Sequence, residues 1–341
     1  MNPQEIFCPN LDCPARGQVG AGNISVHSQK EQRYGCEVCG TTLAASQGTI
    51  FYRLKTEAQV VIIVLTLLAH GCPLQAIVAA YGFDERTIKS WWQRAGQHCQ
   101  KVHEHTVGQS QLDLQQVQAD EIKVKIQGGT VWMALAMMVS TRLGLGGVIS
   151  PHRDKGLIQA LADQIRRVAL CRPLLLAVDG LPSYVKAFQR AFRSKVPRLG
   201  QPGRCHLWSW PDIAIVQVVK QRAAATLTIQ RRLVQGSADL VERLIQASQG
   251  QGGINTAYIE RLNATFRQSL AALARRTRGL ARTPHRLETE LFWSGAVYNF
   301  CTIHTSLAAT PAVAAGLTEQ TWSIEQLLRY GGPSSSLHAI L

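Results

Sequence analysis

Apolar residues recur every three to four positions in three consecutive stretches between residues 54 and 105, which predicts three helices. The first covers 57–69 and ends at His70-Gly71. Pro73 suits the first turn of the second helix, and Asp84 can cap the third. This third helix, DERTIKSWWQRAGQH, carries basic and aromatic side chains together.

A helix, a glycine turn and a basic helix follow one another in a helix-turn-helix, whose last helix enters the major groove of DNA. Three ordinary packed helices would show much the same pattern, so both interpretations stay open on this stretch alone. We assign residues 54–105 to an all-α helix-turn-helix domain. Its candidate DNA contacts are Arg86, Lys89 and Gln93.

Beyond residue 116 the period shortens to about two, which predicts strands. The predicted elements are, in order, strands 117–126, 131–141 and 143–150, helix 154–169, strand 174–178, helix 181–192 and strand 213–219. A helix that begins near Glu260 follows. This is the element order of an RNase H-like α/β fold. We therefore assign 116–310 to one such catalytic domain, with an insert around 193–250, and 311–341 to a C-terminal helix and tail.

The predicted insert has no confident assignment from its pattern. Its first part is rich in arginine and tryptophan, and residues 223–249 look polar and helical. The segment either grips DNA or extends the core. The residues that would grip DNA are Arg193, Lys195, Arg198 and Arg204, with Trp208 and Trp210 as stacking groups. Burial is the more common state of tryptophan, which favours the core.

Four of the nine cysteines stand in two close pairs within residues 1–50. Four residues lie between Cys8 and Cys13, two lie between Cys36 and Cys39, and twenty-two separate the pairs. Such spacing matches a four-thiolate zinc site. The segment is polar, so bound zinc would supply the folding energy that a core cannot. We predict a small zinc ribbon, with a redox CxxC or unrelated thiols as the alternatives.

Two aspartates fall at informative places in the α/β part. Asp120 lies on the first predicted strand, and Asp179 directly follows the wholly apolar strand 174–178. Cleavage of a phosphodiester uses divalent ions that activate the attacking oxygen and stabilise the leaving one. Mg²⁺ prefers oxygen ligands, so a few carboxylates suffice. We predict that Asp120, Asp179 and Glu260 are catalytic and bind Mg²⁺ (or Mn²⁺), and that the neighbouring Glu121 points to the opposite face.

A uniformly basic stretch follows Glu260. From Arg261 to Arg286 there are seven arginines and no acidic residue. This pattern favours a phosphate-binding surface beside the carboxylates, although a solvated amphipathic helix would also show it. The candidate DNA contacts here are Arg267, Arg275 and Arg276.

The charge balance agrees with a nucleic-acid partner. The formal net charge is +14, and the basic residues are spread over several segments. A basic membrane-surface protein would gather them on one amphipathic helix or tail. The first twenty residues show no apolar signal region, and the apolar stretch 58–69 is too short to span a bilayer. We expect a cytoplasmic protein with no membrane partner, whose cysteines serve as thiols or metal ligands.

The chain resembles bacterial insertion-sequence DDE transposases of the group that begins with a zinc ribbon and a helix-turn-helix. The phrases that carry the resemblance cover nearly the whole chain: CPNLDC, CEVCG, QADEI, LLLAVDGLPSY, NTAYIERLNATFRQ, LARRTR and TPAVAAGL. The resemblance implies that Asp120, Asp179 and Glu260 form the catalytic triad and that Arg267 lies near the DNA.

The same resemblance implies a reaction and partners. Hydrolysis at the ends of a mobile element would free 3′-hydroxyls, which would then attack target DNA in line. The expected partner is double-stranded DNA in the bacterial nucleoid. Because two ends must be joined together, a homodimer or a higher synaptic complex is expected. The alternative is a DNA-binding regulator that is derived from such an enzyme and is catalytically inert.

Overall fold

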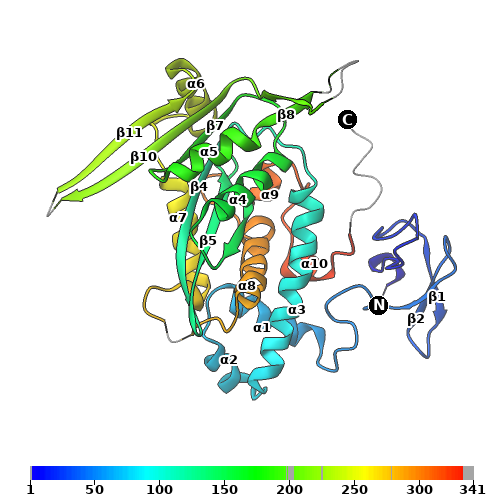
Figure 1. Cartoon of the computed structure of the whole chain (residues 1–341). Helices are drawn as coiled ribbons and strands as arrows, with labels where there is room; N and C mark the ends of the chain where they lie inside the picture. Colours follow the sequence, from blue (N-terminus) through cyan, green and yellow to red (C-terminus); the bar gives the residue numbers. More distant parts are fainter. Residues whose placement is uncertain (1, 197, 199–202, 224–225, 278, 333–341) are drawn as a thin grey trace. The chain divides into compact units, whose positions relative to one another are not determined.

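A computed structural model describes residues 2–196, 198, 203–223, 226–277 and 279–332 (Figure 1). They form two compact units. The first comprises Met1–Thr106, Thr289–Cys301 and Trp322–Leu341, and the second comprises Val107–Glu288 and Thr302–Thr321. Most of the predicted C-terminal tail lies outside the described residues.

A three-stranded antiparallel sheet forms the N-terminal part of the first unit. After the short helix η1 (Pro3–Glu5), its strands are β1 (Ile24–Ser28), β2 (Arg33–Cys36) and β3 (Thr42–Ala44). The buried cluster beneath them is small and consists of Ile6, Cys8, Cys13, Ala15, Ile24, Tyr34, Cys36 and Leu43. Three of these eight residues are cysteines, so little apolar surface is buried here apart from the thiols.

The three helices predicted from periodicity are present in the same unit. They are α1 (Ala58–Ala69), α2 (Leu74–Tyr81) and α3 (Glu85–His103). Asp84 caps α3 as predicted, since its Oδ1 accepts a hydrogen bond from the Arg86 amide at 2.7 Å. Gly82 ends α2 in the left-handed conformation, with φ of +69°. Helix α10 (Ile324–Arg329) also belongs to this unit, and its Leu327 carbonyl oxygen lies 2.9 Å from His98 Nε2 on α3.

The second unit is built on a six-stranded mixed sheet with the order β11-β10-β7-β4-β5-β6. Its strands are β4 (Gln116–Ile126), β5 (Gly129–Met138), β6 (Gly144–Ser150), β7 (Leu174–Asp179), β10 (Ile213–Ala223) and β11 (Thr226–Gln235). β7 is parallel to both β4 and β10, and the other pairs are antiparallel. β7 is therefore a central strand, buried throughout before its last residue, Asp179.

Helices cover both faces of this sheet. They are α4 (Lys155–Val168), α5 (Pro182–Ala191), α6 (Ala238–Gln249) and α7 (Ala257–Ser269). Successive residues of a strand point to opposite faces. On β4, Glu121 bonds to Tyr184 of α5, whereas Asp120 bonds to Asn263 of α7. α5 and α7 therefore lie on opposite faces, and α6 packs against Leu175 and Ala177 on the α7 face.

The remaining helical elements are η2 (Glu104–Gly108), η3 (Ala271–Leu273), α8 (Pro284–Ala296), η4 (Val297–Cys301) and α9 (Pro311–Ala314). Within the described residues, no helix combines the length and apolar character needed to cross a membrane.

The segment predicted as an insert extends the sheet from residue 213 onward, where β10 and β11 lie. The prediction of polar helix for 223–249 was wrong in its first half, because Thr226–Gln235 pairs with β10 as a strand. Its first four residues, TLTI, alternate at the period of a strand. A separate two-stranded sheet, β8 (Arg193–Val196) and β9 (His206–Ser209), precedes it. Next to it Trp210 is buried, but Trp208 on β9 is 67% exposed.

Candidate active site

Asp120 and Asp179 lie side by side where two parallel strands separate. The last register pair of β4 and β7 is Ala119 with Val178, so each aspartate is the next residue on its strand. Residues that pair in parallel strands point to the same face, so both aspartates point toward the α6–α7 face. Asp120 accepts hydrogen bonds from the Glu121 amide at 2.9 Å and from Asn263 Nδ2 at 2.8 Å. Asp179 Oδ1 accepts one from the Leu181 amide at 2.9 Å.

Glu121 joins the two aspartates, which the sequence analysis did not expect. One carboxylate oxygen from each of Asp120, Glu121 and Asp179 lies within 4.8 Å of the others. The side chain of Glu121 does bond to residues on the opposite face, where it accepts from Tyr184 Oη at 2.7 Å and from Arg153. The expectation was incomplete because Glu121 lies just beyond the point where β4 and β7 stop pairing. Its carboxylate can therefore also approach the two aspartate carboxylates.

Glu260 lines the same pocket but stands outside this group of three. The pocket has a volume of about 530 Å³, and its polar walls include Asp120, Asp179, Glu260, Lys220 and Arg153. Glu260 forms an ion pair with Lys220 and accepts a hydrogen bond from Thr256 Oγ1 at 2.7 Å. Burial raises the pKa of Glu260, but the bonds from Lys220 and Thr256 outweigh it, so the pKa is lowered. Glu260 is therefore an ionised carboxylate that a lysine holds at the wall of the pocket.

The pocket concentrates negative charge. Burial, followed by the nearby carboxylates of Glu121 and Asp179, raises the pKa of Asp120 to about 6. Burial, followed by Glu121, also raises the pKa of Asp179, and Arg153, 3.5 Å from its Oδ2, offsets part of this. A divalent cation would relieve this repulsion.

The donor set fits a hard cation such as Mg²⁺ or Mn²⁺, because it offers carboxylate oxygens from two strands. A second feature agrees with this. Asn263, beside Asp120, is 1% exposed, and its Oδ1 has no hydrogen-bond partner among the described residues. A buried polar atom of this kind usually has a partner, such as water or an ion.

Gln118 is a site residue that the sequence analysis missed. It is fully buried on β4, two residues before Asp120. Its Oε1 accepts from the amides of Tyr258 and Ile259, both at 3.0 Å, and its Nε2 donates to the Asn255 carbonyl at 2.8 Å. The N-cap of α7, Thr256, makes no capping bond itself. Gln118 therefore caps the helix that carries Glu260 and ties it to the strand that carries Asp120.

Replacing Gln118 with leucine is expected to destabilise the protein by about 3 kcal/mol, because buried amides and a carbonyl lose their partners. Urea unfolding would measure this. Ser237→Ala, which removes the hydroxyl that caps α6, is a matched control with an expected cost of about 1 kcal/mol.

We also expect weaker Mn²⁺ binding in Gln118→Leu and unchanged binding in Ser237→Ala. Equal Mn²⁺ affinity in the two variants would mean that Gln118 only supports the fold.

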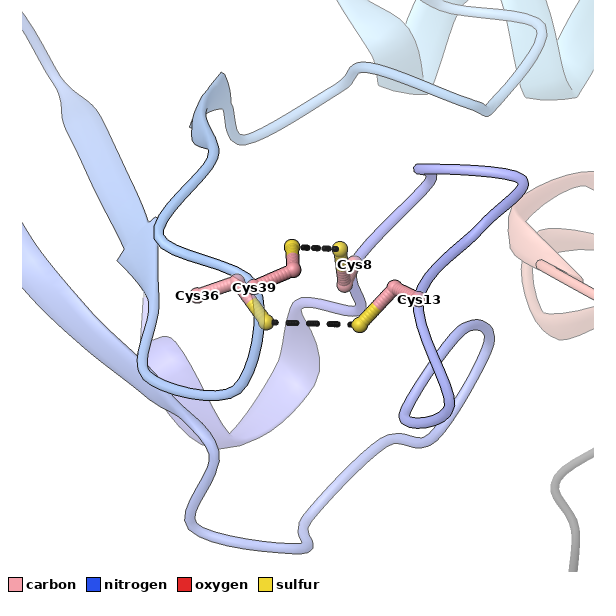
Figure 2. Close-up of side chains that lie close together, drawn as sticks. All are labelled: Cys8, Cys13, Cys36 and Cys39. Carbon is pink, nitrogen blue, oxygen red and sulfur yellow. Dashed lines mark hydrogen bonds between the residues drawn. The ribbon is translucent and has the colours of Figure 1, made fainter.

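The four N-terminal cysteines form a second candidate metal site (Figure 2). All four sulfur atoms lie within 4.8 Å of one another, with Cys8 and Cys39 3.6 Å apart and Cys13 and Cys36 3.8 Å apart. A tetrahedral zinc ion with Zn–S bonds near 2.3 Å separates its sulfurs by about 3.8 Å. The sequence prediction of these four as one cluster is confirmed, and their geometry suits zinc.

Local contacts act differently on the thiols of this cluster. Hydrogen bonds with Thr41 lower the pKa of the Cys39 thiol to about 6, whereas burial raises that of Cys8. Gly40 follows with φ of +69°, a conformation that glycine adopts without strain. No atom lies within 4 Å of the position of a Cβ there, so what this position requires of glycine is its backbone conformation and not its small size.

The predicted DNA contacts occupy two places. Arg86 and Gln93 are exposed on α3, and Lys89, on the same side of the helix, forms an ion pair with Glu85. In the second unit, three arginines line one groove beside β4: Arg267, Arg275 and Arg276.

Comparison with known proteins adds no assignment. No protein-family model matches the chain, and no curated protein matches it.

Proposed function

We propose that this protein is a DDE-type DNA transposase with an RNase H-like catalytic domain. The proposal rests above all on Asp120 and Asp179, which lie side by side where the parallel strands β4 and β7 stop pairing, in one pocket that Glu260 also lines. The order of elements supports it too: three antiparallel strands, then helix, strand, helix, strand and a late helix that carries the glutamate. The net charge of +14 suits a DNA substrate.

In this proposal Asp120 and Asp179 would hold a divalent cation. Glu260 would complete the ligand set once its ion pair with Lys220 is broken. Bound Mg²⁺ or Mn²⁺ would supply activation of the attacking oxygen and stabilisation of the leaving one. The freed Lys220 ammonium would still face the pocket, where it can neutralise a phosphate. Water and then a DNA 3′-hydroxyl serve as nucleophiles, so the protein forms no covalent intermediate.

The first unit would recognise the DNA. Cys8, Cys13, Cys36 and Cys39 would hold a structural zinc ion, and α3 would enter the major groove with Arg86, Lys89 and Gln93. Cutting two element ends together requires two active sites, so we propose a homodimer or higher assembly on DNA.

Nicking of a plasmid that carries the DNA flanking the reading frame tests the proposal. With Mg²⁺ or Mn²⁺ we expect nicks at the element ends with free 3′-hydroxyls, and none when the divalent ion is omitted. Tight binding of the same DNA without any nick in either metal would favour the alternative of an inert regulator derived from a transposase.

A further inference from the structure

Strand β4 has an open edge beyond the carboxylates. β7 ends at Asp179, and β4 runs on from Asp120 to Ile126 with β5 on one side only, among the described strands. On the other side lies the chain that follows α7. The Gln127 amide donates to the Ala281 carbonyl at 2.9 Å, which closes the far end. Between these walls is a groove of about 670 Å³, which we call the β4 groove.

The β4 groove is lined by five cations: Lys123, Lys125, Arg267, Arg275 and Arg276. None of them forms an ion pair with a carboxylate among the described residues. Glu121 is its one acidic residue, and Arg153 and Tyr184 already bind that carboxylate. The groove therefore presents uncompensated positive charge.

One end of this groove meets the carboxylate pocket. Glu121 lines the groove, and one of its carboxylate oxygens lies within 4.8 Å of those of Asp120 and Asp179, which line the pocket. Lys123 and Lys125 are exposed, and two residues of a strand span about 6.6 Å. The two lysines thus stand in a short row of residues that leads along β4 away from Asp120.

We propose that the β4 groove binds the phosphodiester backbone of the nucleic-acid strand that enters the carboxylate pocket, with Lys123 and Lys125 as phosphate ligands. This inference rests on the proposed function and names the route that the substrate takes to the same site. A row of cations in a concave groove suits a chain of phosphates, whereas a membrane surface would call for exposed apolar side chains beside the charges.

The test compares two double variants with the same net charge. Lys123→Gln/Lys125→Gln removes two cations from the groove, and Lys155→Gln/Lys186→Gln removes two exposed lysines from α4 and α5 in the same unit. Binding of a fluorescent DNA duplex from the flanking sequence is measured between 0.05 and 0.3 M salt, roughly the range in which phosphate contacts dominate. Circular dichroism confirms that both variants are folded.

In the groove variant we expect the negative slope of log K against log salt to become less steep by about 1.8. We expect the affinity at 0.1 M salt to fall on the order of tens-fold. The control variant should change the slope by less than about half as much. Equal effects in both variants, or no effect in either, would overturn the groove assignment. The proposed function would still stand in that case if the wild-type protein nicks the plasmid. A wild-type protein that binds no DNA would overturn both.

Discussion

Asp179→Asn is expected to lower metal-dependent DNA nicking by about three orders of magnitude. The variant keeps an oxygen for the Leu181 amide but loses one negative charge from the pocket. Because metal ions contribute several kcal/mol of charge stabilisation, and each 1.36 kcal/mol is tenfold in rate, about a thousandfold loss follows. Initial nicking rates at saturating Mg²⁺, together with Mn²⁺ binding by calorimetry, measure the two effects separately.

Asp163→Asn provides the matched control, since Asp163 is exposed on α4, where it accepts a hydrogen bond from Gln159 Nε2. We expect wild-type rates and wild-type Mn²⁺ affinity. Wild-type activity in Asp179→Asn would remove this aspartate from the chemistry.

At the neighbouring aspartate, loss of activity and loss of stability can be told apart. The pKa of Asp120 is raised to about 6, so this group favours the fold when protonated, and that contribution is lost as the pH rises through 6. Asn263, whose Oδ1 has no hydrogen-bond partner in the described part of the chain, can turn its side-chain amide to accept a hydrogen bond from an asparagine at position 120. Asp120→Asn should therefore abolish nicking at pH 7 while its melting temperature stays equal to that of wild type or rises. A lower melting temperature would show that activity was lost through unfolding.

Local patterns predicted the elements well where one physical cause dominated. The side chain of Asp84 caps the start of α3, as the sequence indicated. The glycine turn expected before this helix is present too, because Gly82 ends α2 with a left-handed backbone. The four cysteines could be grouped from spacing alone, because two close pairs across a loop suit one tetrahedral ion.

Long-range contacts could not be predicted in the same way. Gln118 looks like an ordinary strand residue in the sequence, and only the fold brings the amides of Tyr258 and Ile259 to it, 140 and 141 residues away. Glu121 followed the alternation of its strand, but its carboxylate also reaches the group formed by the two aspartates. The ion pair of Lys220 with Glu260 depends on where β10 lies in the sheet, and no local pattern shows that order.

Loss of zinc is expected to unfold residues 2–50, because their own core is too small to hold them. The strands are five, four and three residues long, and three of the eight residues in their buried cluster are the thiols themselves. Structural zinc contributes roughly 10–16 kcal/mol to the folding of such segments at pH 7, far more than the few kcal/mol available from so small a core. Cys36→Ser should therefore lose the metal, and the backbone amides of this segment should lose their protection from hydrogen exchange.

Zinc content by atomic emission and hydrogen exchange of residues 2–50 would measure this, with Cys171→Ser as the control, since Cys171 is exposed and outside the cluster. We expect about one zinc ion per chain in wild type and in the control, and none in Cys36→Ser. The second unit contains none of the four cysteines, so its exchange should stay unchanged in the variant. A wild-type protein that is metal-free yet protected in this segment would contradict the assignment, because the thiols would then act only as small apolar residues.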